Sequence, residues 1–274
     1  MLHLDSIEVN NRLNEKDTHY WSEVARRWQE AHPTTLWRAY NDSINTSLFT
    51  NWLPSGKVDN LLKTDLFDES LGEGLYSLLV ARAKNVFGID VSTLTTQVAK
   101  QRHNGLQLAA ADVRYLPFSD GTFDSIVSNS TLDHFESKDE ISTGLRELHR
   151  VLRFDGQLLL TLDNLANPVI GLRNLLPFSI LNRLNIVPYY VGATFRPQQL
   201  CECLRQSGFE VLDVQTIMHF PRILTMLMTR ALEKLAGQRI KNSFLSFLMS
   251  FEHLSQWPTR FLTGYYIAVK AIKK

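Results

Sequence analysis

The sequence is poor in cysteine, with Cys201 and Cys203 the two thiols among 274 residues. Two cysteines separated by one residue cannot build a disulfide framework, and a lone Cys-x-Cys pair is poor evidence for a zinc site. No other cluster with metal-ligand spacing is present in the sequence. These absences predict a protein of a reducing, cytoplasmic compartment that holds no metal.

Long hydrophobic runs and an excess of either charge are also absent. No window holds about 18 uninterrupted apolar residues, so no membrane-spanning helix is predicted. Residues 1–17 are too polar for a signal peptide. The net charge is +1 and 44% of the residues are hydrophobic, which is typical of a globular protein without a strong attraction to nucleic acid. A nucleic-acid partner is therefore not expected.

The most informative segment is Leu66–Leu94, which predicts a strand, a tight loop, a helix and a second strand. A short apolar run ends at Asp68, small residues follow, and another apolar run over 86–89 ends at Asp90. Ligands bind at the carboxyl ends of the strands in open α/β sheets. Small residues let a ligand approach the loop backbone, and an acid about 20 residues on accepts hydrogen bonds from ribose hydroxyls. The spacing therefore predicts a ligand that contains a nucleoside.

The loop lacks one residue that a dinucleotide site needs. The dinucleotide fingerprint has a glycine three residues after Gly74, where this chain has Ser77. Glu73 adds a negative charge that would be unfavourable beside a pyrophosphate. A ligand with a positive centre and no phosphate tolerates that charge better, and S-adenosylmethionine is such a ligand. A nicotinamide-dependent oxidoreductase is therefore disfavoured.

Five segments between residues 64 and 163 follow one another as ordered motifs. They are DESLGEG at 68–74, GID at 88–90, AADVRYLPFSDGTFD at 110–124, FDSIVSNSTLDHF at 123–135 and ELHRVLRFDGQLLLT at 147–161. With these motifs, the segment resembles the class I S-adenosylmethionine-dependent methyltransferases, in the broad group that methylates small molecules. The first motif of that family is an acid followed by three alternating glycines, and Ser70 replaces the first of them. Serine disfavours the positive φ that glycine reaches freely, so cofactor affinity falls if the loop needs that conformation.

The resemblance implies S-adenosylmethionine as the cofactor and a set of residues that bind it. The implied cofactor-binding residues are Asp68, Ser70, Gly72, Gly74, Asp90, Val91, Asp112, Val113 and Asn129, with Arg38 as a candidate from the N-terminal segment. Asp90 would accept both ribose hydroxyls, Asp112 would contact the adenine amine, and Asp68 would contact the methionine amino group. Arg38 would bind the methionine carboxylate. Two structural alternatives stay open, namely Asp90 as a helix cap and Asp112 as a solvated loop acid.

The reaction itself requires little chemistry from the protein. The sulfonium of the cofactor carries the reactivity, so neither a protein nucleophile nor a metal is obligatory. His134, after the predicted fourth strand, is a candidate general base for a hydroxyl or amine acceptor, with a place in the pocket wall as the alternative. Tyr189, Tyr190 and His219 are candidate substrate-site residues.

Alternating strand and helix patterns predict an α/β fold with helices on both faces of a parallel sheet. The resemblance implies a Rossmann-like sheet of seven strands that is mostly parallel and has an antiparallel last strand. The expected strands cover 64–68, 85–90, 106–110, 124–129, 157–163, 209–218 and 265–272. The expected core helices cover 73–83, 93–103, 139–152 and 197–208.

We expect a single methyltransferase domain over 1–274 that has four parts. They are a helical N-terminal cap over 1–60, a cofactor-binding core over 61–163, a lid or substrate insertion over 164–196, and the C-terminal part of the sheet over 197–274, which contains a helical insert over 219–262. Family members usually connect the last two strands briefly, so this insert is a departure. Packing on the core is the simplest interpretation, and its apolar and basic pattern also suits a second copy or a membrane surface.

The sequence as a whole predicts an S-adenosylmethionine-dependent methyltransferase with a small-molecule, lipid-like or glycan-intermediate acceptor. Peripheral membrane contact and a homodimer are further expectations that rest on the insert. The alternative function is a methyltransferase-like protein that binds the cofactor without catalysis and acts as a regulatory or partner subunit. The sequence does not identify the methylated atom, because the variable insertions build the acceptor pocket.

Overall fold

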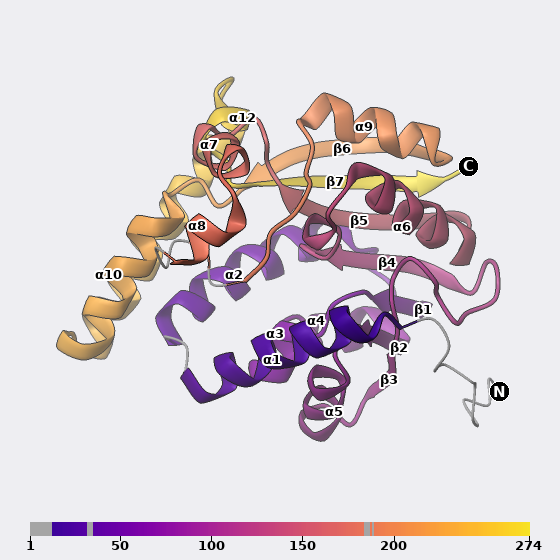
Figure 1. The fold of residues 1–274 in the computed structure, drawn as a ribbon, viewed down its shortest axis with the longest axis horizontal. Coiled ribbons are helices and arrows are strands. Elements are labelled where there is room, and N and C mark those ends of the chain that lie inside the picture. The colour runs from indigo at the N-terminus through magenta and orange to yellow at the C-terminus, as the bar shows by residue number, and fades with distance from the viewer. Residues whose placement is uncertain (1–12, 32–34, 184–186, 188) are drawn as a thin grey trace.

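The computed structural model describes residues 13–31, 35–183, 187 and 189–274, and its centre is one seven-stranded sheet (Figure 1). The strands are β1 (Val58–Lys63), β2 (Ala83–Asp90), β3 (Leu106–Ala110), β4 (Phe123–Asn129), β5 (Leu152–Asp163), β6 (Phe209–Ile217) and β7 (Tyr266–Lys273). They are arranged in the order β3-β2-β1-β4-β5-β7-β6. β7 runs antiparallel to both of its neighbours, and the other pairs are parallel. The predicted Rossmann-like sheet is confirmed.

Helices cover both faces of the sheet and crowd the carboxyl ends of its parallel strands (Figure 1). The helices are α1 (Glu15–Ala31), α2 (Thr35–Trp52), α3 (Phe67–Leu71), α4 (Tyr76–Arg82), α5 (Thr93–Arg102), α6 (Lys138–Val151), α7 (Pro168–Leu175), α8 (Phe178–Arg183), α9 (Pro197–Gln206), α10 (Arg222–Leu235), α11 (Gln238–Ser250) and α12 (Arg260–Thr263). Among the described residues there are also the 3-10 helices η2 (Leu132–His134) and η3 (Phe251–Gln256). In the described part of the chain, no helix combines the length and apolarity needed to cross a bilayer.

The central strands supply two hydrophobic cores, one on each face of the sheet. In β1, Leu62 joins the cluster that contains α6 and α9, whereas Leu61 joins the cluster that contains α2 and α4. In β5, Leu158 and Leu159 divide in the same way. Successive strand side chains point to opposite faces, and a parallel sheet buries both faces under helices. This alternation places successive side chains of each central strand in the two cores.

The first strand lies earlier in the chain than we predicted. We expected a strand over 64–68, but β1 ends at Lys63 and residues 67–71 form the short helix α3. The polar residues Asp59 and Asn60 conceal the strand in the sequence, because an apolar run is the usual signal of a buried parallel strand. The other predicted strands overlap observed ones, and α4 begins later than the helix we expected there.

The insert between β6 and β7 packs on the core, which confirms the simplest interpretation of that segment. Phe244 and Leu248 of α11 are buried in the same cluster as Tyr40 of α2. The Tyr40 hydroxyl donates a hydrogen bond to Glu252 Oε1 at 3.3 Å. The other carboxylate oxygen of Glu252 accepts from the Met218 N–H at 3.0 Å. The insert therefore holds α2 against the end of β6.

A buried ion pair fastens the segment after β1 to the sheet. Lys63 is 2% exposed, and its Nζ lies 3.0 Å from Glu69 Oε2 on α3. The second oxygen of Glu69 accepts a hydrogen bond from the Leu75 N–H at 2.9 Å. Burial lowers the pKa of the Lys63 ammonium, but Glu69 and Asp65 together raise that pKa above its ordinary value. The ion pair therefore sets the path of the chain from β1 to α4.

We predict that Lys63→Met lowers the free energy of unfolding by about 3–5 kcal/mol, because it leaves the Glu69 carboxylate buried without its partner. The double variant Lys63→Met/Glu69→Gln should regain part of that loss, since position 69 no longer carries a buried charge. Lys84→Met, which breaks the exposed pair with Asp59, is the control and should change stability little. Urea unfolding of all four proteins measures the effect. A Lys63→Met protein as stable as the wild type would contradict the prediction.

Candidate functional site

A cavity of about 600 Å³ lies at the carboxyl edge of β1, β2, β3 and β4. This volume is within the roughly 300–1,000 Å³ of sites that enclose small ligands. Its walls come from α1, α2, the loops after these four strands, the segment after α7 and the start of α10. The sequence-predicted residues in its lining are Arg38, Asp68, Asp90, Val91, Asp112, Val113, Asn129, His134, Tyr189 and Tyr190.

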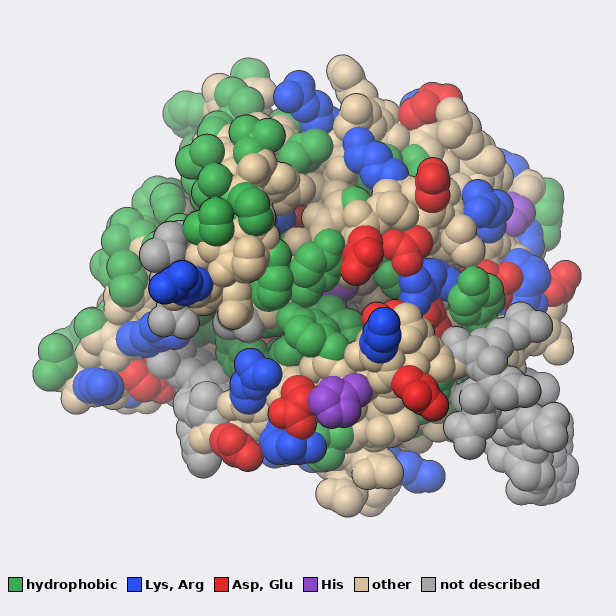
Figure 2. Space-filling model, viewed as in Figure 1, with side chains coloured by type: hydrophobic (Ala, Val, Ile, Leu, Met, Phe, Trp, Pro, Cys, Tyr) green, Lys and Arg blue, Asp and Glu red, His purple; other side chains and the backbone are tan. Residues whose placement is uncertain are grey.

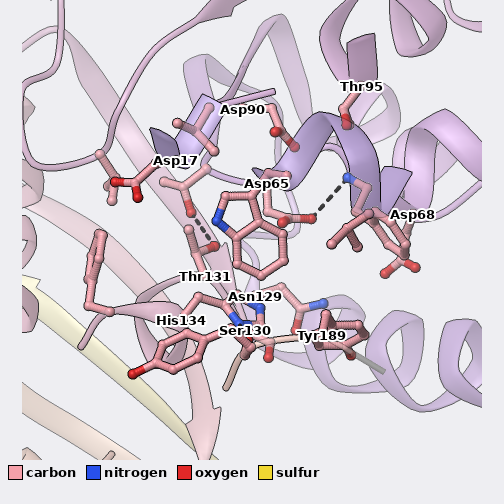
Figure 3. A pocket seen from close by; sticks show the side chains of 18 of the residues that line it. Asp17, Asp65, Asp68, Asp90, Thr95, Asn129, Ser130, Thr131, His134 and Tyr189 are labelled. Atoms are coloured by element: carbon pink, nitrogen blue, oxygen red, sulfur yellow. Dashed lines mark hydrogen bonds between the residues drawn. The ribbon is translucent and has the colours of Figure 1, made fainter. Parts of the chain in front are cut away.

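Three carboxylates from different elements surround the same part of the cavity. Figure 3 shows Asp65, Asp68 and Asp90 on one side of it, with His134 and Tyr189 on the other. Burial raises the pKa of the Asp68 carboxyl to about 7, assisted by Asp42 and Glu69. Burial and the neighbouring Asp65 raise the pKa of Asp90 to about 7 as well. A ligand with a positive centre would offset the repulsion between these carboxylates and stabilise their ionised forms.

Asp90 stands at the end of β2 with both oxygens held by backbone groups. Its Oδ2 accepts from the Leu66 N–H at 3.1 Å, and its Oδ1 accepts from the Ser92 N–H at 2.8 Å. Ser92 Oγ, in turn, accepts from the Thr95 N–H and caps α5. The cap of α5 is therefore Ser92, and Asp90 lines the cavity with its carboxylate fixed in position. A carboxylate has about four lone-pair sites, so further donors can still bind.

Asp112 follows β3 and forms a tight pair with Arg114. The Arg114 backbone N–H and side-chain Nε donate to Asp112 Oδ1 at 2.8 and 3.0 Å. Arg114 Nη2 also donates to Asp17 of α1 at 3.0 Å, and Nη1 donates to Glu140 of α6. The guanidinium carbon lies 4.7 Å from the centre of the Phe135 ring. Arg114 thus joins α1, α6 and the β3 loop at one wall, and the sequence analysis did not single it out.

Arg38 reaches the segment after β1 from α2. Its Nη2 donates to the Asp68 carbonyl at 3.1 Å. A Cβ on Gly72 would lie 2.8 Å from the same Nη2, so glycine at that position makes room for the arginine. Arg38 therefore lies beside the segment that carries Asp68, and its binding to the methionine carboxylate stays a prediction.

The loop after β4 carries a strained residue beside the cavity. Ser130 has a φ of 51°, which is uncommon for a residue other than glycine. Its N–H donates to both the carbonyl and the Oγ1 of Thr161, and its hydroxyl donates to Asp133. Asn129, directly before it, accepts from the Thr161 hydroxyl at 2.7 Å. Strain that is held by several bonds is typical of functional loops.

His134 lies in the cavity wall on η2. Its Nδ1 is 3.1 Å from the Tyr190 carbonyl, and a carbonyl only accepts, so Nδ1 carries a hydrogen in this contact. The ring packs against Trp21 with ring centres 4.7 Å apart, and against Tyr189 at 5.7 Å. The Tyr190 N–H is 2.6 Å from the hydroxyl oxygen of Tyr20. These contacts tie α1, η2 and the segment after α8 together; residues 184–186 and 188 of the predicted lid lie outside the described residues.

Four sequence-predicted residues do not line the cavity. Ser70 is buried within α3, and its hydroxyl donates to the Phe67 carbonyl. Because its backbone is helical, Ser70 does not adopt the positive φ that a loop glycine could reach. Gly74 has a φ of 51°, and a Cβ there would lie 2.7 Å from Glu69 Oε1. The carbonyl of Gly72 accepts from His103 Nε2 at 2.9 Å. His219, two residues after β6, contacts the Thr263 hydroxyl through Nδ1 and the Thr216 carbonyl through Nε2. The cofactor-binding role that the resemblance implied for Ser70, Gly72 and Gly74 therefore has no support from the lining of the cavity.

Several lining residues were missed by the sequence analysis: Asp17, Asp65, Trp37, Arg114, Arg222 and Tyr266. Asp65 would have followed from the correct end of β1, because it lies two residues beyond that strand. Arg114 lies within the motif at 110–124, two residues after Asp112. Asp17, Trp37, Arg222 and Tyr266 lie outside the motifs and reach the cavity through the packing of α1, α2, α10 and β7, so no local pattern identifies them.

We predict that Asp68→Asn stabilises the ligand-free protein at pH 8 by more than about 1 kcal/mol. The folded pKa of about 7 exceeds the ordinary value of 3.8, so wild-type stability is full below pH 4 and falls as the pH rises toward 7. The asparagine removes that loss, and the two proteins should be equally stable near pH 4. Urea unfolding at pH 4, 6 and 8 measures the difference. If the stability of the two proteins changed with pH in the same way, the raised pKa of Asp68 would be disproved.

Comparisons with known proteins agree with this architecture. A family model of the methyltransferase domain matches residues 67–160. A demethylmenaquinone methyltransferase of Lactobacillus johnsonii is 26% identical over 229 residues, which cover 74% of this chain and 89% of that protein. A probable tRNA methyltransferase 9B of Mus musculus is 32% identical over 93 residues, which cover 34% of this chain and 20% of that protein.

Among solved structures, the chain is similar in fold to a protein of Thermotoga maritima described as an S-adenosylmethionine-dependent methyltransferase and possible histamine N-methyltransferase. The TM-score is 0.58 at 15% identity, and the match covers 94% of this chain and 99% of that one. The segment matched by the family model runs from α3 to β5 and contains the loops that bring Asp68, Asp90 and Asp112 to the cavity. The match over 67–160, the sheet order and the motifs together support a class I S-adenosylmethionine-dependent methyltransferase.

Proposed function

We propose that the cavity binds S-adenosylmethionine and that the chain transfers its methyl group to a small-molecule or lipid-like acceptor. The observation that carries this proposal is the set of carboxylates at one edge of the sheet, where Asp90 and Asp112 follow adjacent parallel strands. The lining holds more carboxylates than cations among the described residues. That balance suits a cofactor with a sulfonium and an ammonium group.

Each end of the cofactor has a matching group in the wall. Asp90, fixed by two backbone donors, would accept the ribose hydroxyls. Asp112 and the backbone of Val113 would hold the adenine. Arg38 would bind the methionine carboxylate, and the nearby Asp68 would attract the amino group. When bound, the cofactor supplies an electrophilic methyl group, and the protein supplies position and electrostatic support.

The acceptor would lie on the aromatic side of the cavity. Trp21, Trp28, Phe178, Tyr189 and Tyr190 contribute rings to the lining. Aromatic walls suit an apolar or planar small molecule. The relative named as a demethylmenaquinone methyltransferase supports a small-molecule acceptor. We assign the predicted lid to the described part of 164–196, because it supplies three of these rings.

His134 is the candidate general base. Its Nδ1 faces the Tyr190 carbonyl, which leaves Nε2 to accept a proton from an acceptor hydroxyl or amine. Packing against Trp21 and Tyr189 fixes the ring. An acceptor that needs no proton removal would use the same residue only as part of the wall.

We also propose that an apolar surface formed by α7, α8 and α10 contacts a lipid surface. Its exposed side chains are Val169, Leu172, Leu175, Leu176, Ile180, Ile223, Leu224, Leu227 and Leu235. Figure 2 shows hydrophobic side chains gathered over this end of the molecule. Arg230 and Lys234 are exposed on the same helix, α10, and would favour anionic lipid.

We predict that S-adenosylhomocysteine binds the wild type and binds Asp90→Ala at least about 10-fold more weakly, because charge-assisted hydrogen bonds to the ribose are lost. Asp213→Ala, which removes a carboxylate of β6 outside the cavity, is the control and should bind like the wild type. Calorimetric titration measures the affinities, and thermal melting checks that each variant is folded.

The outcomes separate the two functions that the sequence analysis left open. No binding by a folded wild type, or equal binding by Asp90→Ala, would refute the cofactor site. Binding without release of S-adenosylhomocysteine from S-adenosylmethionine, across a panel of acceptors, would favour the regulatory or partner subunit.

We predict that the apolar surface binds vesicles of phosphatidylcholine with phosphatidylglycerol. Leu175→Ser/Leu227→Ser should reduce the bound fraction in co-sedimentation, because both side chains are exposed, at 81% and 59%. Leu212→Ser, on the edge strand β6 and 48% exposed, is the control and should have no effect. Gel filtration of the same proteins tests the homodimer. A dimer that the double variant dissociates, together with no vesicle binding, would show the surface to be a subunit interface instead.

A further inference from the structure

Arg222, the first residue of α10, places its guanidinium in the cavity wall among aromatic side chains. Its Nη2 donates to the Tyr189 hydroxyl at 3.2 Å, and its Nη1 donates to the hydroxyls of Tyr265 and Tyr266 at 3.3 and 3.2 Å. The guanidinium carbon lies 5.6 Å from the Trp37 ring centre and 5.1 Å from that of Tyr265. Three segments distant in sequence, namely α2, the segment after α8 and the start of β7, thus converge on this cation of α10.

No carboxylate of the described residues lies within 4.0 Å of the Arg222 side-chain nitrogens. Arg114 and Arg173 differ in this respect, whereas Arg38 of the cavity wall contacts a carbonyl. Arg114 faces three carboxylates, and Arg173, which is 8% exposed, pairs with Asp163 at 2.7 Å. An arginine stays charged in a protein, and phenol hydroxyls do not neutralise it. The fold therefore presents a positive charge to the cavity without a carboxylate partner among the described residues.

The three phenols do more than support the arginine. A hydroxyl that accepts a hydrogen bond from Arg222 retains its own O–H, so it can donate to a ligand oxygen. A guanidinium carries five N–H donors in a plane. The three contacts above use Nη1 twice and Nη2 once, so the Nε–H and one Nη2–H stay free of these contacts. Arg222, Tyr189 and Tyr266 all line the cavity. The combination of a fork of N–H donors and adjacent O–H donors matches the geometry of an oxyanion.

We propose that Arg222, with Tyr189 and Tyr266, forms an oxyanion-binding subsite, and that the methyl acceptor carries a carboxylate or phosphate group on an apolar or aromatic body. The inference deepens the proposed function, on which it rests for the role of the ligand as acceptor. Arg38 stands beside the Asp68 carbonyl and is assigned to the cofactor, whereas Arg222 stands beside Tyr189, which packs against His134. The anionic group would thus be held on the side of the cavity that carries the candidate base.

Three small probes test the subsite without knowledge of the natural acceptor. Benzoate and phenyl phosphate carry the two oxyanions, and benzyl alcohol is their neutral counterpart. Each is titrated calorimetrically into the wild type, alone and with saturating S-adenosylhomocysteine. Arg222→Gln removes the charge, Arg222→Lys keeps it without the planar fork, and Arg230→Gln makes the same substitution at an exposed position of α10.

At least one anionic probe should bind the wild type and Arg230→Gln at least 10-fold more tightly than Arg222→Gln, with Arg222→Lys between them. Benzyl alcohol should bind all four proteins within threefold of one another. The stronger of the two anionic probes identifies the class of oxyanion. Retained affinity for S-adenosylhomocysteine and an unchanged melting temperature show that Arg222→Gln is folded.

Two results would overturn the subsite. One is equal affinity of the anionic probes for Arg222→Gln and the wild type, or an affinity for the wild type that does not exceed that of benzyl alcohol. The other is a fall in S-adenosylhomocysteine affinity in Arg222→Gln without any change for the probes, which would assign the arginine to the cofactor. A failure of the cofactor site would appear as no binding of S-adenosylhomocysteine to the wild type. The titrations of the probes without S-adenosylhomocysteine would still test the oxyanion-binding subsite.

Discussion

The buried ion pair of the Lys63 ammonium is the interaction on which the site depends. Parallel strands end at the same edge, so this fold brings the acids at the ends of β1 and β2 close together in a partly buried position. Lys63 lies 3.0 Å from Glu69 and 4.0 Å from Asp65, and its charge also lowers the pKa of Asp68 and Asp90 against the effect of burial. Without it, several carboxylates would be crowded with no internal cation to offset them.

The remaining imbalance of charge has a functional direction. Lys63 offsets the acids behind the cavity wall, while Asp68 and Asp90 keep pKa values of about 7 at its surface. A cofactor with a positive centre would stabilise their ionised forms. At the other side, Arg222 carries the opposite charge among aromatic rings. The cavity is thus polarised between a carboxylate wall and a guanidinium, a pattern that suits a cationic methyl donor and an anionic acceptor.

The insert between β6 and β7 adds one charged residue to the pocket. Its helix α11 packs on α2 through Phe244 and Leu248, and Arg222, the first residue of α10, reaches the cavity. The segment that the family model covers builds one part of the wall, and α1, α2, the segment after α7, α10 and β7 contribute to the rest. The same insert also contributes exposed leucines to the apolar surface.

Periodic apolar segments and ordered motifs are local signals, so the sheet, its helices and the family resemblance could be predicted from the sequence. The first strand was predicted too late in the chain, because the polar residues of β1 break the apolar pattern. The assignment of Asp90, Asp112 and the loop glycines to the cofactor stays a prediction; the two acids line the cavity, whereas Gly72 and Gly74 leave room for Arg38 and Glu69. The contacts of Arg222 with three tyrosines could not be predicted, since these residues come from segments that meet only through packing over long sequence separations.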